Sequence, residues 1–149
     1  MKLLKIGISG VRGIVGETIT PELVMNFASA FGTSLHRNPV LISRDTRVSG
    51  PMLHAACVSA LMSTGCDVLD LGICPAPILQ YALKKFRAKG AISISAGHND
   101  IAWNALTFIN QEGTYLNVFQ GEEVLDIYHL GKFAKASSDK LGRMKPVEG

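Results

Sequence analysis

Apolar and polar positions change period along this chain, and each period predicts a different secondary structure. Residues 91–95 show the strand pattern, because Ile92 and Ile94 alternate with two serines. Residues 21–34 show the helix pattern, with apolar side chains three and four positions apart. The pattern predicts strands at residues 3–8, 40–43, 66–71, 91–95 and 103–110. It predicts helices at 21–34, 52–64, 77 to about 90, and 121–130.

Capping residues mark the ends of several predicted helices. Thr20 precedes Pro21, the pairing expected of an N-cap hydroxyl and a first-turn proline. Ser49 is predicted to cap the helix at 52–64, and Gly65 to close it. Glu122 and its acidic neighbour are expected in the first turn of the last helix.

The order of these elements predicts an α/β fold. Strands alternate with helices over most of the chain, which favours a three-layer α/β/α sandwich with a mixed, mostly parallel sheet. The strand at 103–110 is expected to run antiparallel, because its connection is too short for a helical crossover. Residues 1–135 are interpreted as one domain, and residues 136–149 as a tail or the start of an interdomain linker.

Composition narrows the classes of protein that fit. The 149 residues are 47% hydrophobic and 18% charged, which suits a packed core. A net charge of +3 weakly favours anionic ligands and falls short of a nucleic-acid footprint. The apolar runs are too short to span a membrane, and residues 1–5 do not form a signal peptide. We therefore expect a cytoplasmic protein with neither a nucleic-acid nor a membrane partner.

The three cysteines fit buried free thiols better than a functional site. Cys57, Cys66 and Cys74 lie in apolar surroundings and form no Cys-x-x-Cys pair. Free thiols in a reducing compartment are the favoured interpretation, with a disulfide or a metal site as the alternative.

Candidate chemistry begins after the strand at 91–95. Residues 96–100 (Ala-Gly-His-Asn-Asp) form a loop of mostly small side chains, and such loops can turn backbone N–H groups toward an anion. His98 adds a donor and Asn99 an amide. Residues 9–13 are predicted to form a glycine-spaced turn that presents Arg12 to a phosphate. The alternative for Arg12 is a surface side chain in a flexible turn.

Four segments resemble motifs of the α-D-phosphohexomutases, the phosphoglucomutase and phosphomannomutase family, in the family's order and spacing. Residues 6–13 (Ile-Gly-Ile-Ser-Gly-Val-Arg-Gly) resemble Phe-Gly-Thr-Ser-Gly-x-Arg-Gly, and residues 43–49 (Ser-Arg-Asp-Thr-Arg-Val-Ser) resemble Gly-Arg-Asp-x-Arg-x-Ser. Residues 74–77 (Cys-Pro-Ala-Pro) resemble Val-Pro-Thr-Pro. Residues 95–100 (Ser-Ala-Gly-His-Asn-Asp) resemble the phosphoserine loop Thr-Ala-Ser-His-Asn-Pro.

The resemblance implies the first of the family's four domains, together with a set of site residues. Gly97 stands at the phosphoserine position, Thr107 at that of a catalytic lysine, and Asp100 at that of the loop proline. By resemblance, the catalytic positions are Gly97, His98 and Asn99, the phosphate-binding ones Ser9, Arg12 and Ser95, and the supporting ones Arg44, Asp45 and Arg47. On residue types alone, a local Arg/Asp ion pair beside a capping serine is the favoured interpretation of residues 44–49.

The resemblance also implies a function, with departures. The family transfers a phosphoryl group within hexose phosphates (an isomerase of carbohydrate metabolism), using Mg²⁺ and a hexose 1,6-bisphosphate activator. The Mg²⁺ ligands are expected outside this chain. Without the serine and the lysine, the chain alone is expected to be inactive and to work with further domains of a longer chain, or to self-associate. Ser95 could replace the missing serine as nucleophile only if the loop were rebuilt, because it lies two residues before position 97, roughly 6 to 7 Å away along an extended chain.

Two alternatives remain open. One is a non-catalytic module, derived from this fold, that binds a sugar phosphate or a partner. The other is a fragment without independent activity, whose apolar faces normally dock on missing domains.

Overall fold

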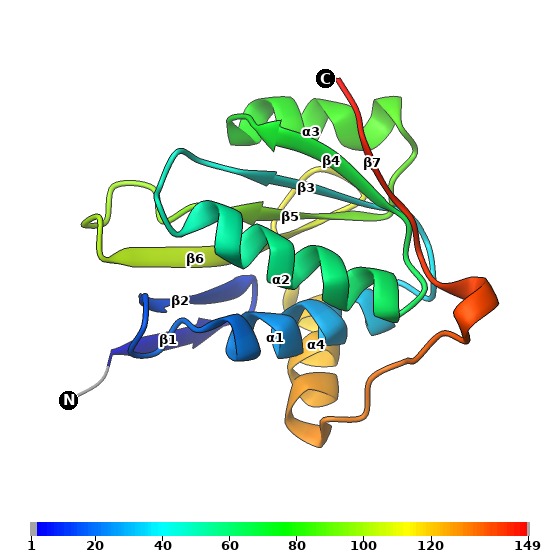
Figure 1. Cartoon of the computed structure of the whole chain (residues 1–149), viewed down its shortest axis with the longest axis horizontal. Helices are drawn as coiled ribbons and strands as arrows, with labels where there is room; N and C mark the ends of the chain where they lie inside the picture. Colours follow the sequence, from blue (N-terminus) through cyan, green and yellow to red (C-terminus); the bar gives the residue numbers. More distant parts are fainter. Residues whose placement is uncertain (1–2, 149) are drawn as a thin grey trace.

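The computed structural model describes residues 3–148, whose strands form one sheet between two layers of helices (Figure 1). The strands are β1 (Leu4–Gly7), β2 (Gly10–Ile14), β3 (Val40–Arg44), β4 (Val68–Ile73), β5 (Gly90–Ile94), β6 (Trp103–Asn110) and β7 (Met144–Pro146). The helices are α1 (Pro21–Ser34), α2 (Gly50–Ser63), α3 (Ala76–Lys85) and α4 (Val118–Leu130), and a 3-10 turn spans Ser138–Lys140.

The sheet is mixed, as the sequence predicts. Its strand order is β1-β2-β6-β5-β3-β4-β7. The neighbours β5, β3, β4 and β7 are parallel, whereas β6 is antiparallel to both β5 and β2, and β2 to β1. The antiparallel β6 confirms the argument from its short connection, and the α/β fold class is confirmed with it.

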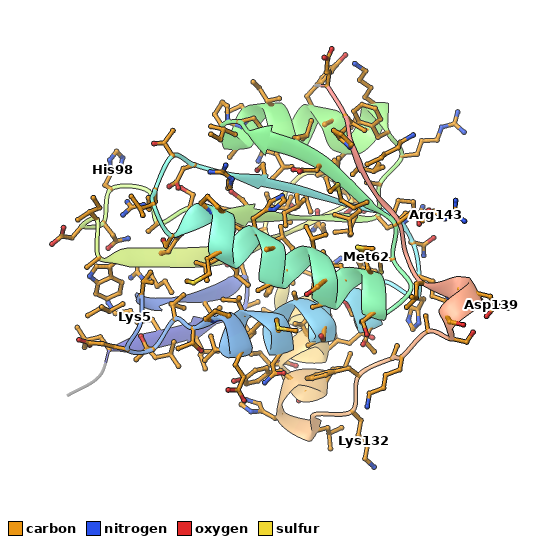
Figure 2. All side chains as sticks on the ribbon, viewed as in Figure 1. Lys5, Met62, His98, Lys132, Asp139 and Arg143 are labelled. Atoms are coloured by element: carbon orange, nitrogen blue, oxygen red, sulfur yellow. The ribbon has the colours of Figure 1, made fainter. Side chains whose placement is uncertain are left out.

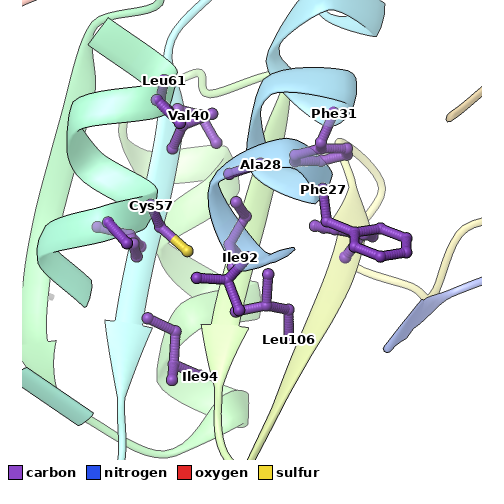
Figure 3. Close-up of a cluster of buried hydrophobic side chains, with 14 of the residues drawn as sticks. Phe27, Ala28, Phe31, Val40, Cys57, Leu61, Ile92, Ile94 and Leu106 are labelled. Carbon is purple, nitrogen blue, oxygen red and sulfur yellow. The ribbon is translucent and has the colours of Figure 1, made fainter. Parts of the chain in front are cut away.

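Three helices cover one face of the sheet and one covers part of the other. α1, α2 and α4 pack on the first face, over a core that contains Phe31, Ile92 and Leu106 (Figure 3). The rings of Phe31 and Phe108 stack with centroids 4.7 Å apart. α3 packs on the opposite face, where Leu79 and Leu83 contact a smaller core. Because α3 is the only helix of residues 3–148 on that face, part of the sheet there is left uncovered.

The predicted turn at residues 9–13 is wrong, because most of it belongs to β2. Residues 10–14 pair with β1 on one side and with β6 on the other. The strand is hard to recognise in the sequence because two of its five residues are glycines, which have a weak preference for strands. At Gly10 the backbone passes so close to the Leu106 carbonyl oxygen that a Cβ would overlap it. A glycine at this position therefore allows β2 to lie close to β6.

Helix starts were predicted with mixed success. Thr20 caps α1 as expected, its hydroxyl accepting the Leu23 N–H at 3.2 Å. Ser49 precedes α2 but makes no capping hydrogen bond. α4 starts three residues earlier than predicted, because Asn117 and Gln120 form a capping box, so the two glutamates lie beyond its first turn.

Residues 136–148 contribute to the sheet edge, which their polar composition does not indicate. β7 pairs in parallel with β4, and the Arg143 N–H donates to Asp67 Oδ1 at 2.9 Å. The domain limits expected at residues 1–135 and 136–149 include residues 1, 2 and 149, which lie outside the described residues. The boundary at 135/136 stays a prediction.

Two further predictions concern membrane-spanning helices and the state of the cysteines. No helix among residues 3–148 has the length and apolar character needed to cross a bilayer. The prediction of free cysteines is confirmed, with Cys57 and Cys66 buried and Cys74 half-buried.

Candidate functional site

The candidate site lies on the sheet face that α3 leaves partly uncovered. Along β5, Ile92 and Ile94 point into the core beneath α1 and α2, so Ser93 points to the opposite face. Thr107 of β6 is paired with Ser93 and lies on that same face. On its other side, Thr107 is paired with Gly10 of β2, whose strand also carries Arg12. Cross-strand pairing therefore gathers polar side chains that lie far apart in the sequence.

A pocket of about 360 Å³ occupies this face. Its polar lining comes from Arg12, Ser93, Ser95, Gly97, Asn99 and Thr107. Arg12 is the single charged residue among the described residues that line it, and no carboxylate does so. The resulting surface of one guanidinium, hydroxyls and an amide suits an anionic ligand that also carries hydroxyl groups.

Loop 96–100 forms one wall of this pocket and is held by short-range hydrogen bonds. The Gly97 N–H donates to Ser95 Oγ at 3.2 Å, and Asn99 Nδ2 donates to the Ala96 carbonyl at 2.6 Å. Gly97 has a left-handed backbone with φ +60°, a conformation that favours glycine. No atom outside its immediate neighbours lies within 4 Å of where its Cβ would be, so the space beside it is open.

Arg47 holds the same loop from the other side. Its Nη1 donates to the carbonyls of Asp100 (2.6 Å) and Trp103 (3.1 Å). Its Nη2 donates to the carbonyls of Gly97 (3.0 Å) and Asn99 (2.8 Å). The Arg47 side chain is only 13% exposed, and Nε pairs with Asp45 Oδ2 at 3.2 Å. A single guanidinium thus binds four backbone carbonyls and one carboxylate.

The residues near Arg47 hold the end of β3 in place and do not line the pocket. The Asp45 N–H donates to the Ile94 carbonyl at 3.0 Å, which joins the end of β3 to that of β5. Arg44 Nη1 makes a long hydrogen bond of 3.3 Å to the Asp45 carbonyl. Ser49 Oγ accepts a hydrogen bond from Asn104 Nδ2 at 2.8 Å. Of the predicted ion pair and serine cap, the Arg47–Asp45 pair is present and the cap is not.

Two predicted site residues lie apart from the pocket lining. His98 is exposed and its side chain projects outward from the end of the molecule (Figure 2). Ser9 lines a neighbouring hollow of about 300 Å³, which shares Arg12 and Thr107 with the pocket. Ser95, Asn99 and Arg12 are brought together, while Arg44, Asp45 and Arg47 lie behind the loop.

Several lining residues were missed from the sequence, among them Ser93, Ala76 and Tyr115. Ser93 follows from the alternation of β5, so that pattern was a usable signal. Ala76 lies in the first turn of α3, whose positive dipole end borders the pocket. Tyr115 reaches the site because the chain turns at Gly113 and bridges back to Ile109. No local motif marks this return.

The residues present do not suit a bound metal ion. Among residues 3–148, no group of three or more His, Cys, Asp or Glu side chains is placed to hold one. Of the acids nearest the loop, Asp45 is paired with Arg47 and Asp100 Oδ1 accepts the Ile101 N–H at 2.6 Å. Within residues 3–148, neither carboxylate belongs to a cluster that would hold a Mg²⁺ ion by itself.

Comparison with known proteins identifies the fold and its family. The sequence profile of the phosphoglucomutase/phosphomannomutase α/β/α domain I matches residues 3–135. A phosphoglucomutase/phosphomannomutase of Thermococcus kodakarensis is 40% identical over 144 residues, covering 93% of this chain and 32% of that protein. A phosphoglucosamine mutase of Clostridioides difficile is 39% identical over 115 residues, covering 74% of this chain and 26% of that protein. The chain thus spans about a third or less of the length of these relatives.

Solved structures agree on the fold. A phosphoglucomutase/phosphomannomutase family protein from Burkholderia thailandensis superimposes with a TM-score of 0.79 at 21% identity, over 97% of this chain and 34% of its own. A structure from Thermus thermophilus gives 0.82 at 22% identity, over 99% and 34%. Together with the profile match and the four motifs, these similarities lead to one assignment: the chain belongs to the phosphoglucomutase/phosphomannomutase family, of which it represents α/β/α domain I.

Proposed function

We propose that this chain is the first domain of a phosphohexomutase-like protein and supplies part of a binding site for a hexose phosphate. The observation that carries the proposal is the pocket in which Arg12, Ser95, Gly97, Asn99 and Thr107 meet. These residues come from two of the family-like motifs and from the strand that follows them. One guanidinium and several hydroxyls suit a phosphate joined to a polyol.

We further propose that the chain alone does not transfer a phosphoryl group. Gly97 has no oxygen to carry the group, and Thr107 cannot supply the positive charge of a lysine. Phosphoryl transfer depends on charge placed around the transferred group, and a single arginine gives too little. The Mg²⁺ ligands are placed outside residues 3–148, within which no group of three or more His, Cys, Asp or Glu side chains is arranged to hold a metal ion.

We propose that the residues named by the family resemblance have the following roles in the intact protein. Arg12, Ser9 and Ser95 would bind phosphate oxygens, Asn99 would orient them, and Arg44, Asp45 and Arg47 would support the loop. His98 would reach the ligand only when a further domain closes over the pocket. A cytoplasmic location is proposed with this function, because the relatives are mutases and the thiols are free.

The experiment has a binding arm and a turnover arm. Calorimetry of the 149-residue chain with α-D-glucose 1-phosphate should detect binding, and Arg12→Ala should weaken it about tenfold or more through loss of a charge-assisted contact. Arg143→Ala, an exposed arginine next to the start of β4, is the matched control. Equal affinity of Arg12→Ala and wild type would refute the assignment of the pocket.

The turnover arm separates the catalytic and binding interpretations. With Mg²⁺ and glucose 1,6-bisphosphate, the isolated chain should form no glucose 6-phosphate. Covalent phosphorylation that Ser95→Ala abolishes would instead make Ser95 the nucleophile. No binding of any hexose phosphate would favour the alternative function, a module that binds a protein partner.

A further inference from the structure

Arg47 orients the peptide units of loop 96–100, because its guanidinium binds their carbonyl groups. Gly97 and Asn99 line the site pocket and also a hollow of about 390 Å³ beside Arg47 and Asp45, so the loop is the wall between the two. On the Arg47 side, the carbonyls of Gly97 and Asn99 accept hydrogen bonds from the guanidinium. The carbonyl faces of these two peptide units are thereby fixed.

Fixing a carbonyl also fixes the amide that follows it. Residues 3–148 contain no cis peptide bond, and in a trans peptide unit the C=O and the next N–H point in opposite directions. The N–H groups of His98 and Asp100 therefore point away from the guanidinium. Neither donates a hydrogen bond to any of the described residues, whereas the amides of Gly97, Asn99 and Ile101 all do.

Two unpaired amides that leave the same side of a short loop form a concave donor site for an anion. Between them lies the Asn99 peptide unit, whose own N–H is turned inward to Ala96 at 3.1 Å. The Asp100 carboxylate is held by the Ile101 N–H, which orients it toward the following residue. No side chain at position 97 occupies the space beside the loop.

We propose that Arg47 is a positioning residue that creates an anion-binding site from the backbone amides of His98 and Asp100. The guanidinium acts through the loop carbonyls and does not touch the ligand. The ligand is a phosphate group, contributed either by a free phosphate ion or by a phosphate monoester. The inference rests on the proposed function of the pocket and adds backbone donors from the loop that borders it, next to the lining residues Gly97 and Asn99.

The test is a titration of the ¹⁵N-labelled 149-residue chain with inorganic phosphate, at constant ionic strength against chloride. The amide resonances of His98 and Asp100 should shift together and saturate. Arg47→Lys retains the positive charge but cannot bind four carbonyls at once, because an ammonium has three donors and no fork. It should lower phosphate affinity about tenfold or more, while amides of the Phe31–Phe108 core keep their wild-type positions.

Two further variants keep the result decisive. Arg143→Lys makes the same chemical change away from the loop and should match wild type. Asp45→Asn removes the negative charge that faces Arg47 Nε while leaving Arg47 and its loop contacts in place, and should weaken phosphate binding less than Arg47→Lys does. If Arg47→Lys does not fold, Asp45→Asn is compared with wild type instead, and a phosphate affinity equal to that of wild type would then overturn the inference.

The outcomes separate this inference from the function on which it rests. Unchanged phosphate affinity in Arg47→Lys, or saturable shifts confined to other amides, would overturn the inference. If glucose 1-phosphate shifts amides of Arg12 and Thr107 but never those of His98 and Asp100, the pocket stands and the backbone site falls. If neither phosphate nor glucose 1-phosphate binds the wild-type chain, both fall. Parallel loss of both ligands in Arg47→Lys supports the inference with the monoester as ligand.

Discussion

Restoring a serine at position 97 should cost the fold little. Gly97 has φ +60°, and no atom beyond its neighbours lies within 4 Å of a Cβ built there. Gly97→Ser therefore adds side-chain atoms to open space, and its cost comes from the left-handed backbone, about 1 kcal/mol for a residue with a Cβ. The hydrogen bond from the residue 97 N–H to Ser95 Oγ can remain, because it uses only the backbone of residue 97.

Urea denaturation followed by circular dichroism measures this cost as the change in the free energy of unfolding at an unchanged m-value. Gly16→Ser is the matched control, because Gly16 has φ +87° and is equally open, so it should lose a similar amount. Gly10→Ser is the contrast, since its Cβ would overlap the Leu106 carbonyl oxygen and should prevent normal strand pairing.

A loss of more than about 3 kcal/mol in Gly97→Ser, a size reserved for core, strain or network defects, would refute the reasoning. It would mean that the loop tolerates only glycine and that its geometry is specific to this sequence. A loss near that of Gly16→Ser would leave the loop able to carry a serine. The variant should still show no mutase turnover, because Thr107 remains at the position where the resemblance expects a lysine.

Three further predictions test other parts of the structure. Burial raises the pKa of the Cys57 thiol from 9.0 to about 12, so unfolding releases its proton at high pH. The contribution of Cys57 to stability should therefore be unchanged below pH 9 and be lost between pH 9 and 12, so stability should fall more steeply over that range in wild type than in Cys57→Ala, as urea titrations at each pH would reveal. Phe108→Ala removes the stack with Phe31 and should cost about 3 to 5 kcal/mol in the same assay, and a cost below about 1 kcal/mol would contradict the packing. Asp100→Asn should raise phosphate affinity about two- to threefold by removing one screened negative charge, and an affinity that falls in calorimetry would contradict the proposed site.

The elements with strong periodicity and local caps could be predicted from the sequence. Thr20 and Pro21 marked the start of α1 because the capping hydrogen bond is local. β6 was predicted with its direction, because a short connection permits only an antiparallel neighbour. β2 was missed because its glycines serve a contact with β6, a strand much later in the chain, and no local pattern reveals that contact.

The site could be predicted in part, for a similar reason. The family-like motifs pointed to Arg12, Ser95 and Asn99, which meet at the pocket. They could not reveal that Tyr115 returns to it, since this depends on the turn at Gly113 and a bridge to Ile109. Nor does a sequence show which way a peptide carbonyl points, so the four contacts of Arg47 became visible only in the folded chain.

These contacts also explain how the loop can keep its shape while its side chains change. Within loop 96–100 and at Trp103, Arg47 contacts only backbone carbonyls, and backbone carbonyls are the same whatever the residue type. A glycine in place of a serine at position 97, or an aspartate in place of a proline at position 100, therefore leaves every acceptor of the guanidinium in place. Changing Arg47 itself removes all of these hydrogen bonds at once. The loop should accordingly tolerate substitution at position 97 far better than at position 47, although neither the arginine nor the loop carbonyls contact the ligand in the proposed complex.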